Sequence, residues 1–206
     1  MGLQVSAILL AAGLSRRMGT PKQLLEIGGK PLARHCLDTL TASGIADIVV
    51  VLGDLRHKIG PVICDLPIKM VANPAAECEM AESVRVGLGA VDSRSSGVLI
   101  CLTDHPFVAV ETYRQIVEAH FTAPMAIVIP TYQERRGHPS LFPRDLIHDL
   151  FSGGNLRDII HAHPGKVGLL PVDDPETIRD IDTMDDYEQA RVAFDERKCQ
   201  HLQNGS

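Results

Sequence analysis

The chain has 206 residues, and its 26 acidic against 20 basic side chains give a formal net charge of −6. A hydrophobic share of 45% is typical of a globular domain with a core, and it excludes an intrinsically disordered chain. The acidic balance argues against a broad basic surface for nucleic acids or anionic membranes. No stretch approaches the roughly 20 apolar residues of a membrane span, and the five scattered cysteines lack the CxxC spacing of a zinc or dithiol site. The sequence therefore predicts a cytoplasmic protein with neither a nucleic-acid nor a membrane partner.

Short apolar runs alternate with amphipathic stretches over the first part of the chain. Runs rich in β-branched residues predict buried strands at 5–10, 47–52, 68–72, 97–102 and 126–130. Apolar residues at helical spacing predict helices at 31–43, 56–64, 80–91 and 109–120. The strand runs are continuous rather than alternating, which indicates a sheet covered on both faces. The strand–helix order then predicts a three-layer αβα, Rossmann-like fold around a mostly parallel sheet.

The strand–helix rhythm loosens after residue 130. We expect a loop at 134–139, short helices near 143–150 and 155–162, a strand near 167–171 and a closing helix from about residue 184. Without a linker or an internal repeat, residues 1–198 are expected to form one domain and residues 199–206 a disordered tail. Ligands of open parallel sheets bind beyond the carboxyl ends of the strands, so the candidate loops are 11–22, 73–83, 103–106 and 131–139.

The loop at 10–22, LAAGLSRRMGTPK, combines small residues with cations. Small side chains at 11–13 allow the backbone to approach a ligand closely, and successive N–H groups there can hold phosphate oxygens. Arg16, Arg17 and Lys22 add positive charges that suit phosphate. The loop contains neither a GxxxxGK[ST] nor a GxGxxG motif. Composition alone leaves a phosphate-binding loop and a solvated basic loop equally open.

Asp104 lies in the segment TDHP at 103–106, directly after the apolar run at 97–102. An acidic residue at the end of a strand and facing a phosphate loop is a natural Mg²⁺ ligand, because Mg²⁺ takes carboxylate, water and phosphate oxygens. The alternative is a helix cap, since Pro106 fits the first turn of the following helix. His105 gives no evidence for a general base.

Acidic residues gather near the end of the chain, where residues 171–196 carry ten acidic and two basic side chains. Asp180 and Asp182 alternate along an extended segment, so both point to one face. The following residues, 183–186, predict a helix start in which a threonine caps the helix and two carboxylates complement its dipole. We accept this helix start for residues 183–186.

The segment RGHP at 136–139 enters the apolar run SLF. Gly137 permits an unusual backbone turn, and Pro139 stiffens the exit from it. His138 can hydrogen-bond or charge-pair with a phosphate, and a purely structural turn histidine is the open alternative.

The order LAAGxSxRMGxxK followed by LLxxxGKPLxxH resembles the signature of the MobA-like NTP transferases, nucleotidyltransferases of molybdenum-cofactor synthesis. It is most similar to the MocA-type, or molybdenum cofactor cytidylyltransferase, branch, and the resemblance extends to about residue 190. It implies the nucleotide-diphospho-sugar transferase type of the predicted fold.

The resemblance also implies roles in the first loop. Ala11, Ala12 and Gly13 would border the nucleotide, while Arg17 and Lys22 would bind the triphosphate. Ala12 stands where the guanylyltransferase relatives usually have glycine, and its methyl group would narrow the base pocket, which favours CTP over GTP.

Further matches imply the remaining site residues. Asp104 and Asp182 match the carboxylates that hold Mg²⁺, and His138 matches a loop on the acceptor side. Asn73 and Ser83 match the family segment NPxWxxGMSxSLRxGL and are assigned to nucleotide binding. The chain departs from the family pattern at Ala76, Glu79, Ala81 and Gly154, which puts acceptor binding in doubt.

The sequence therefore predicts Mg²⁺-dependent transfer of a nucleoside monophosphate from CTP to a phosphate-bearing acceptor, such as molybdopterin cofactor, with release of pyrophosphate. Lys22, Arg17 and Asp104 are the predicted catalytic residues. Two alternatives stay open: a sugar-phosphate, alditol-phosphate or phosphocholine nucleotidyltransferase of the same fold, and a nucleotide-binding accessory protein without turnover. In either molybdenum-related hypothesis, a molybdoenzyme or its maturation factor is a potential partner.

Overall fold

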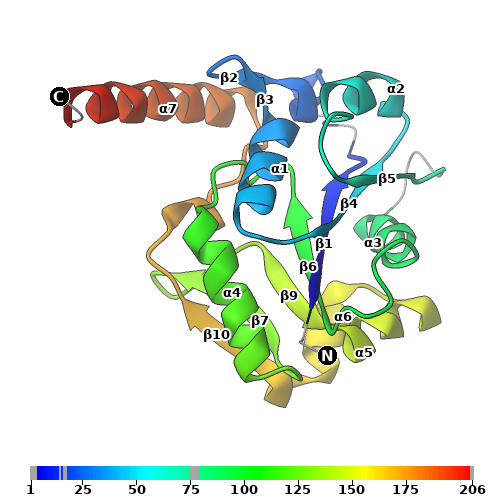
Figure 1. Ribbon diagram of the computed structural model, residues 1–206. Coiled ribbons are helices and arrows are strands. Elements are labelled where there is room, and N and C mark those ends of the chain that lie inside the picture. Colours follow the sequence, from blue (N-terminus) through cyan, green and yellow to red (C-terminus); the bar gives the residue numbers. More distant parts are fainter. Residues whose placement is uncertain (1–3, 14, 16–17, 75–78, 205–206) are drawn as a thin grey trace.

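The computed structural model describes residues 4–13, 15, 18–74 and 79–204. Strands span Val5–Ala11 (β1), Asp47–Leu52 (β4), Lys69–Ala72 (β5), Gly97–Leu102 (β6), Ile127–Tyr132 (β7), Arg135–Arg136 (β8), Ser140–Pro143 (β9) and Val167–Pro171 (β10). In this described part they form one sheet in the order β10-β7-β9-β6-β1-β4-β5, with β8 paired to β7 (Figure 1). A separate antiparallel hairpin joins Glu26–Ile27 (β2) to Lys30–Pro31 (β3).

Strand β1 lies in the middle of the parallel part of the sheet. It pairs in parallel with β4 on one side and with β6 on the other, and β5 extends the sheet beyond β4. Its side chains alternate between two cores, so that Ala7 and Leu9 face one of them and Ile8 faces the other. Burial on both faces explains why the run is continuously apolar.

Helices cover both faces of the sheet, which confirms the predicted three-layer αβα fold (Figure 1). One face carries Leu32–Ala42 (α1), Arg56–Ile59 (α2) and Val110–Thr122 (α4). The other face carries Met80–Leu88 (α3), Arg144–Ile147 (α5) and Leu156–Ala162 (α6). Short 3-10 helices lie at Lys22–Leu24 (η2), Gly60–Val62 (η3), His148–Ser152 (η4), Pro164–Lys166 (η5) and Pro175–Ile178 (η6).

Proline and glycine set the ends of two of these helices. Helix α1 begins directly after Pro31 and stops before Gly44, whose φ of +88° is a conformation that favours glycine. The helix predicted at 56–64 is shorter than expected, because α2 ends at Ile59 and continues as η3. Pro61 lies at this junction and has no N–H to continue the α-helical hydrogen bonds.

Strand β9 is the main difference from the predicted topology. It lies antiparallel between β6 and β7, in the stretch between the loop expected at 134–139 and the helix expected from about residue 143, where no strand was predicted. A four-residue run is too short to show a period in the sequence, so its pairing is set by its neighbours. The predicted strand at 68–72 also differs, because β5 ends the sheet and exposes most of its residues.

The closing helix α7 spans Met184–Asn204 and projects away from the sheet (Figure 1). The segment at 199–206 was expected to be a disordered tail, but helix α7 continues through it as far as Asn204. The sequence from Met184 to that point contains neither glycine nor proline, so nothing in it terminates the helix earlier.

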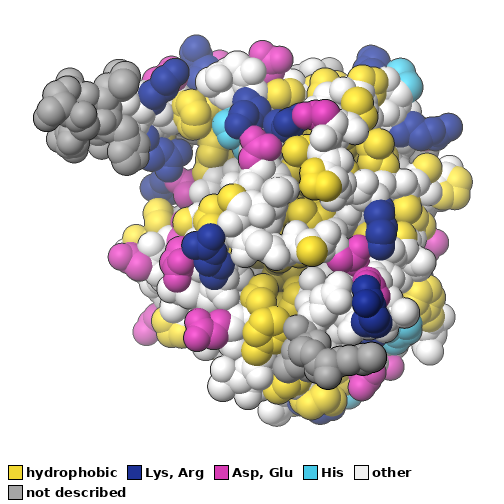
Figure 2. Space-filling view, in the orientation of Figure 1, with side chains coloured by type: hydrophobic (Ala, Val, Ile, Leu, Met, Phe, Trp, Pro, Cys, Tyr) yellow, Lys and Arg dark blue, Asp and Glu magenta, His cyan; other side chains and the backbone are white. Residues whose placement is uncertain are grey.

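No helix within the described ranges is long and apolar enough to cross a membrane. Figure 2 shows acidic and basic side chains interspersed over the visible face, without a single large basic patch. This face agrees with the acidic balance of the composition.

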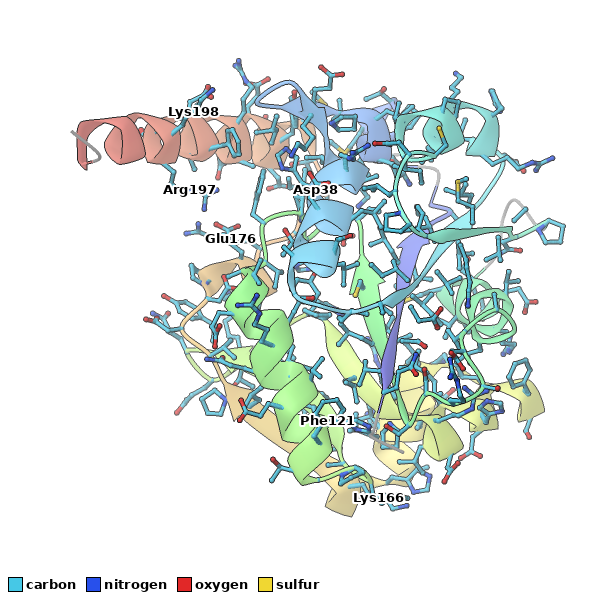
Figure 3. All side chains as sticks on the ribbon, in the orientation of Figure 1. Asp38, Phe121, Lys166, Glu176, Arg197 and Lys198 are labelled. Carbon is cyan, nitrogen blue, oxygen red and sulfur yellow. The ribbon has the colours of Figure 1, made fainter. Side chains whose placement is uncertain are left out.

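Aromatic side chains fasten α7 to the rest of the molecule. Tyr187 and Phe194 pack against a small core cluster that includes Ile27 of the β2–β3 hairpin, and the Tyr187 hydroxyl donates to the Glu26 carbonyl at 2.7 Å. Farther along, Arg197 donates a 2.9 Å hydrogen bond to Glu176 of η6, and the two lie between the helix and the body of the protein (Figure 3). The start of α7 is thereby held beside the carboxyl edge of the sheet.

At the opposite edge, Asp47 holds the start of β4. Its carboxylate accepts hydrogen bonds from Lys69 Nζ at 2.7 Å, from the Asp92 N–H at 2.7 Å and from the Ser6 hydroxyl. Burial raises the pKa of the Asp47 carboxyl, but the hydrogen bonds from Lys69 and Ser6 outweigh burial, and the pKa lies below its ordinary value.

We expect Asp47→Asn to lower the free energy of unfolding by about 1.5–3 kcal/mol at pH 7, because it weakens hydrogen bonds to a buried charge. Since the folded-state pKa is the lower one, this stabilisation is complete above the unfolded Asp pKa of about 3.9 and is lost as the pH falls below it. Urea unfolding at pH 7 and pH 3 measures the change. Asp65→Asn, on an exposed carboxyl paired with Arg34, is the control and should lower the free energy of unfolding much less than Asp47→Asn does. An Asp47→Asn effect that is the same at both pH values would contradict this role.

Candidate active site

Several of the candidate residues meet at the carboxyl edge of the sheet. Ala11 ends β1, Asp104 follows β6 by two residues, and Asn73 directly follows β5. The order β6-β1-β4-β5 places these ends side by side. This is the edge at which ligands of open parallel sheets bind.

Lys22 connects this edge to the start of α7. Its Nζ lies 3.0 Å from Asp104 Oδ2 and 2.8 Å from Asp182 Oδ1, and it also donates to the Ile181 carbonyl at 3.3 Å. The Lys22 side chain is only 13% exposed. The structure thus brings together three predicted site residues that are far apart in the sequence.

The charge of Lys22 is opposite in sign to the charges of Asp104 and Asp182, which favour its ionised form. Burial lowers the pKa of Lys22, but the Asp104 and Asp182 carboxylates outweigh burial, and the net effect is a raised pKa. Lys22 is therefore protonated at neutral pH. The second oxygen of Asp104, Oδ1, is buried and has no hydrogen-bond partner within the described residues.

The position of Asp182 depends on two backbone devices. The Ile181 N–H donates to the Asp104 carbonyl at 2.9 Å, which fixes the extended segment against the end of β6. Asp186 Oδ2 then accepts from the N–H groups of Asp182 and Thr183 at 3.1 and 2.8 Å. The Thr183 hydroxyl in turn accepts from the Asp186 N–H, so the predicted helix start is confirmed beside the candidate ligand.

The first loop is shaped by a glutamine that the sequence did not single out. Gln23 is 1% exposed, and its Nε2 donates to the carbonyls of Ala11 and Gly13 at 3.2 and 2.8 Å. These bonds turn two carbonyls toward the protein. Gly53 supports the loop from β4, because a Cβ there would lie 2.7 Å from the Ala12 carbonyl oxygen.

The cationic part of the loop is described only in part. Ser15 has a φ of +49°, and its Oγ accepts from the Lys22 N–H at 3.0 Å, which fixes the backbone of Lys22. Arg16 and Arg17 lie outside the described residues, so the role of Arg17 stays a prediction.

Asn73 and Ser83 are brought together by β5 and α3. Asn73 Nδ2 donates to Ser83 Oγ at 3.0 Å, and both residues are buried. They therefore join the end of β5 to the start of α3, and their contact with a nucleotide stays a prediction. Of the departures from the family segment, Ala81 is buried in α3 and Glu79 precedes that helix, whereas Ala76 lies outside the described residues.

The loop with His138 is held by η6. The His138 N–H donates to the Thr177 carbonyl at 2.8 Å, and a Cβ at Gly137 would lie 2.6 Å from the same oxygen. Burial and the neighbouring His105 lower the pKa of His138 to about 4. His138 is therefore neutral at pH 7, so it can hydrogen-bond to a phosphate but does not carry a permanent positive charge.

A metal would have to be shared between protein and ligand. No three His, Cys, Asp or Glu side chains in the described ranges are arranged to hold a metal ion by themselves. Asp104 and Asp182 nevertheless converge on one cation, and the second oxygen of Asp104 has no hydrogen-bond partner within the described residues, although His105 Nε2 lies 3.9 Å from it. Such a pair fits Mg²⁺, which is usually held by one or two carboxylates together with water and substrate phosphates.

The roles of two supporting residues could not be predicted from the sequence. Gln23 follows Lys22 directly, but only the folded loop shows that its side chain reaches back to Ala11. Asp174 is similar: it caps η6 and accepts hydrogen bonds from the Ala109 N–H and the Thr112 hydroxyl, at 2.9 and 2.7 Å. It thereby ties the loop of His138 to α4.

The chain is similar in sequence to proteins of known name. The nicotine blue oxidoreductase of Paenarthrobacter nicotinovorans is 28% identical over 193 residues, which cover 88% of this chain and 93% of that protein. The bifunctional protein GlmU of Symbiobacterium thermophilum is 30% identical over 130 residues, or 62% of this chain, and the match spans only 27% of that relative.

Solved structures are also similar. The crystal structure of Rv0371c from Mycobacterium tuberculosis H37Rv matches with a TM-score of 0.82 and 29% identity over 92% of this chain and 97% of that one. A second structure of the same protein, with a TM-score of 0.76 and 26% identity over 92% and 98% of the two chains, is a complex with manganese. A nucleotidyl transferase from Methanothermobacter shares the fold, with a TM-score of 0.83 and 21% identity over 95% of this chain and all of that one.

The family comparison covers most of the chain. The model of the MobA-like NTP transferase domain matches residues 7–167, from the middle of β1 to the start of β10. The chain therefore belongs to the MobA-like NTP transferase family, a family of nucleotidyltransferases.

Proposed function

We propose that the protein transfers a nucleoside monophosphate from an NTP, with CTP favoured, to the phosphate group of a small acceptor in the cytoplasm, in a Mg²⁺-dependent reaction. Molybdopterin cofactor is the first acceptor to test. The observation that carries the proposal is the convergence of Lys22, Asp104 and Asp182 beside the backbone of the first loop.

In this reaction a phosphate oxygen of the acceptor attacks the α-phosphorus of the NTP. A new P–O bond forms, the bond to the β-phosphate oxygen breaks, and pyrophosphate leaves with the electron pair. An ionised phosphate is already nucleophilic, so no residue has to remove a proton. Catalysis therefore depends on positioning and on neutralisation of charge.

The residues of the chain supply these two effects. Lys22 provides a fixed positive charge for the triphosphate, and the backbone at 11–13, shaped by Gln23, positions it. Neutral His138 can donate a hydrogen bond to the acceptor phosphate. A Mg²⁺ ion held by Asp104 and Asp182 would neutralise charge that develops on the phosphate oxygens.

The preference for CTP rests on Ala12. A Cβ at Gly53 would lie 2.7 Å from the Ala12 carbonyl oxygen, so the Ala12 backbone packs closely against the residue that follows β4. The methyl group of Ala12 therefore takes space that a glycine would leave open, and the smaller pyrimidine base is favoured.

The proposal is tested by measuring pyrophosphate release with each of the four NTPs, with and without molybdopterin cofactor. We expect release that needs both CTP and the acceptor. Parallel samples contain sugar phosphates, alditol phosphates and phosphocholine, which cover the other acceptor classes of the fold. A strong preference for ATP or GTP would contradict the cytidylyl assignment.

The same experiment separates two further outcomes. Tight binding of CTP with Mg²⁺, without release of pyrophosphate from any acceptor, would indicate an accessory protein without turnover. Because one relative is a nicotine blue oxidoreductase, reduction of nicotine blue by NADH or NADPH is measured as well. Reduction of the dye without any nucleotidyl transfer would contradict the proposal.

Gln23→Ala should raise the KM for the NTP by about tenfold and leave kcat within about threefold, because the first loop loses the bonds that shape it before the reaction begins. Steady-state kinetics with varied NTP measure both constants. Gln189→Ala, on an exposed position of α7, is the matched control and should change neither. A fall in kcat at unchanged KM would show that Gln23 acts in another way.

A further inference from the structure

We propose that Lys22 is an internal cation that occupies the metal position until the nucleotide arrives, so that the divalent ion binds together with the triphosphate and not before it. This inference rests on the proposed function, because it takes Asp104 and Asp182 as the metal ligands. It adds an order of binding to that site.

The contacts of Lys22 carry the inference. Its ammonium group has three N–H donors, and three oxygens accept from it: Asp104 Oδ2 at 3.0 Å, Asp182 Oδ1 at 2.8 Å and the Ile181 carbonyl at 3.3 Å. Carboxylate and carbonyl oxygens are also the ligands that hard divalent cations take. The ammonium therefore occupies the point on which the protein's metal-binding oxygens converge.

Electrostatic repulsion prevents the Lys22 ammonium and a divalent ion from occupying this position at the same time. With Lys22 in place, two carboxylates face one positive charge, and a divalent ion bound to the same oxygens would lie at contact distance from the ammonium. Like charges at this separation repel strongly in a partly buried site.

A bound triphosphate would relieve the repulsion between the Lys22 ammonium and the divalent ion. Its oxygens offer the ammonium new partners, and the divalent ion can then take oxygens from both the protein and the phosphates. Only the flexible stem of Lys22 has to move, because its backbone N–H is held by Ser15 Oγ at 3.0 Å.

The test is Mn²⁺ binding to the protein, followed by electron paramagnetic resonance of free Mn²⁺ with and without α,β-methylene-CTP, after subtraction of the Mn²⁺ that the nucleotide binds in samples without protein. The wild-type protein should bind Mn²⁺ at least about tenfold more tightly when the nucleotide is present. Lys22→Met removes the competing charge and should bind Mn²⁺ without nucleotide at least about tenfold more tightly than wild type. This gain in affinity would accompany a loss of activity.

Two controls make the comparison specific. Lys30→Met removes a lysine that pairs with Asp38 away from the site, and its Mn²⁺ affinity should equal that of wild type. The double variant Lys22→Met, Asp104→Asn should lose the gain. Thermal unfolding monitors the fold of each variant, and Lys22→Gln replaces Lys22→Met if the latter does not fold.

Two contrary results can be told apart. If wild type and Lys22→Met bind Mn²⁺ equally well without nucleotide, Lys22 does not compete with the ion and the inference is wrong, while the proposed function stands. If no variant binds Mn²⁺ even with the nucleotide, the metal role of Asp104 and Asp182 fails, and the inference fails with it.

Discussion

Replacing Asp104 with asparagine should lower the rate of pyrophosphate release by at least about 10²–10³-fold and leave the fold intact. The substitution keeps the shape of the side chain but removes one of the two negative charges that face Lys22 Nζ, and it weakens a ligand proposed for Mg²⁺. Asp104 is 21% exposed at the end of β6, outside the two main cores, so its charge contributes little to packing.

Single-turnover and steady-state pyrophosphate assays at saturating CTP measure this effect, and circular dichroism with thermal unfolding checks the fold. Asp195→Asn is the matched control, because it changes an exposed carboxylate on α7 that lies outside the site and should keep activity within about threefold. Asp104→Asn with close to the wild-type rate would remove Asp104 from the catalytic machinery.

Phe142→Ala should lower the free energy of unfolding by about 3–5 kcal/mol, which is a large part of the stability of an ordinary domain. Phe142 is 1% exposed and belongs to the core that α3, α5 and α6 cover. It lies in β9, between β6 and β7, so its loss leaves a cavity under the strand that connects the two halves of the sheet.

Urea unfolding followed by circular dichroism measures the change. Phe121→Ala removes the same side chain from an exposed position on α4, where 43% of the residue is accessible, and should cost less than about 1 kcal/mol. If the two phenylalanine variants were equally stable, β9 would not be the packed element that the fold requires.

Much of the fold could be predicted because local patterns and burial agree over the parallel strands. The runs at 47–52 and 97–102 match β4 and β6 at both ends, since strands covered on two faces are apolar throughout. Strand β9 could not be predicted, because four residues carry no period and its antiparallel pairing depends on β6 and β7. The edge position of β5 is likewise a property of the whole sheet.

Some residues of the candidate site could likewise be predicted from the sequence, and others could not. Lys22 and Asp104 lie in recognisable motifs after β1 and β6, so the amino-acid sequence alone is enough to identify them. Gln23 and Gly53 could not be identified, because their roles arise from contacts with the backbone of Ala11 and Ala12 across the loop. Asp182 lies beyond residue 167, where the match to the family model ends, but it was predicted from the resemblance of its segment, and the structure places it 2.8 Å from Lys22 Nζ.

The attachment of α7 has a practical consequence for work on this protein. Asp182 lies two residues before a helix whose grip on the molecule comes from Tyr187 and Phe194, farther along the chain. Removing Tyr187 and Phe194 by truncation or proteolysis within α7 would therefore loosen the helix start that follows Asp182 without touching any residue of the site. If such a fragment were inactive, the cause would be the lost attachment of α7, and the result would not show that residues of the helix take part in the reaction.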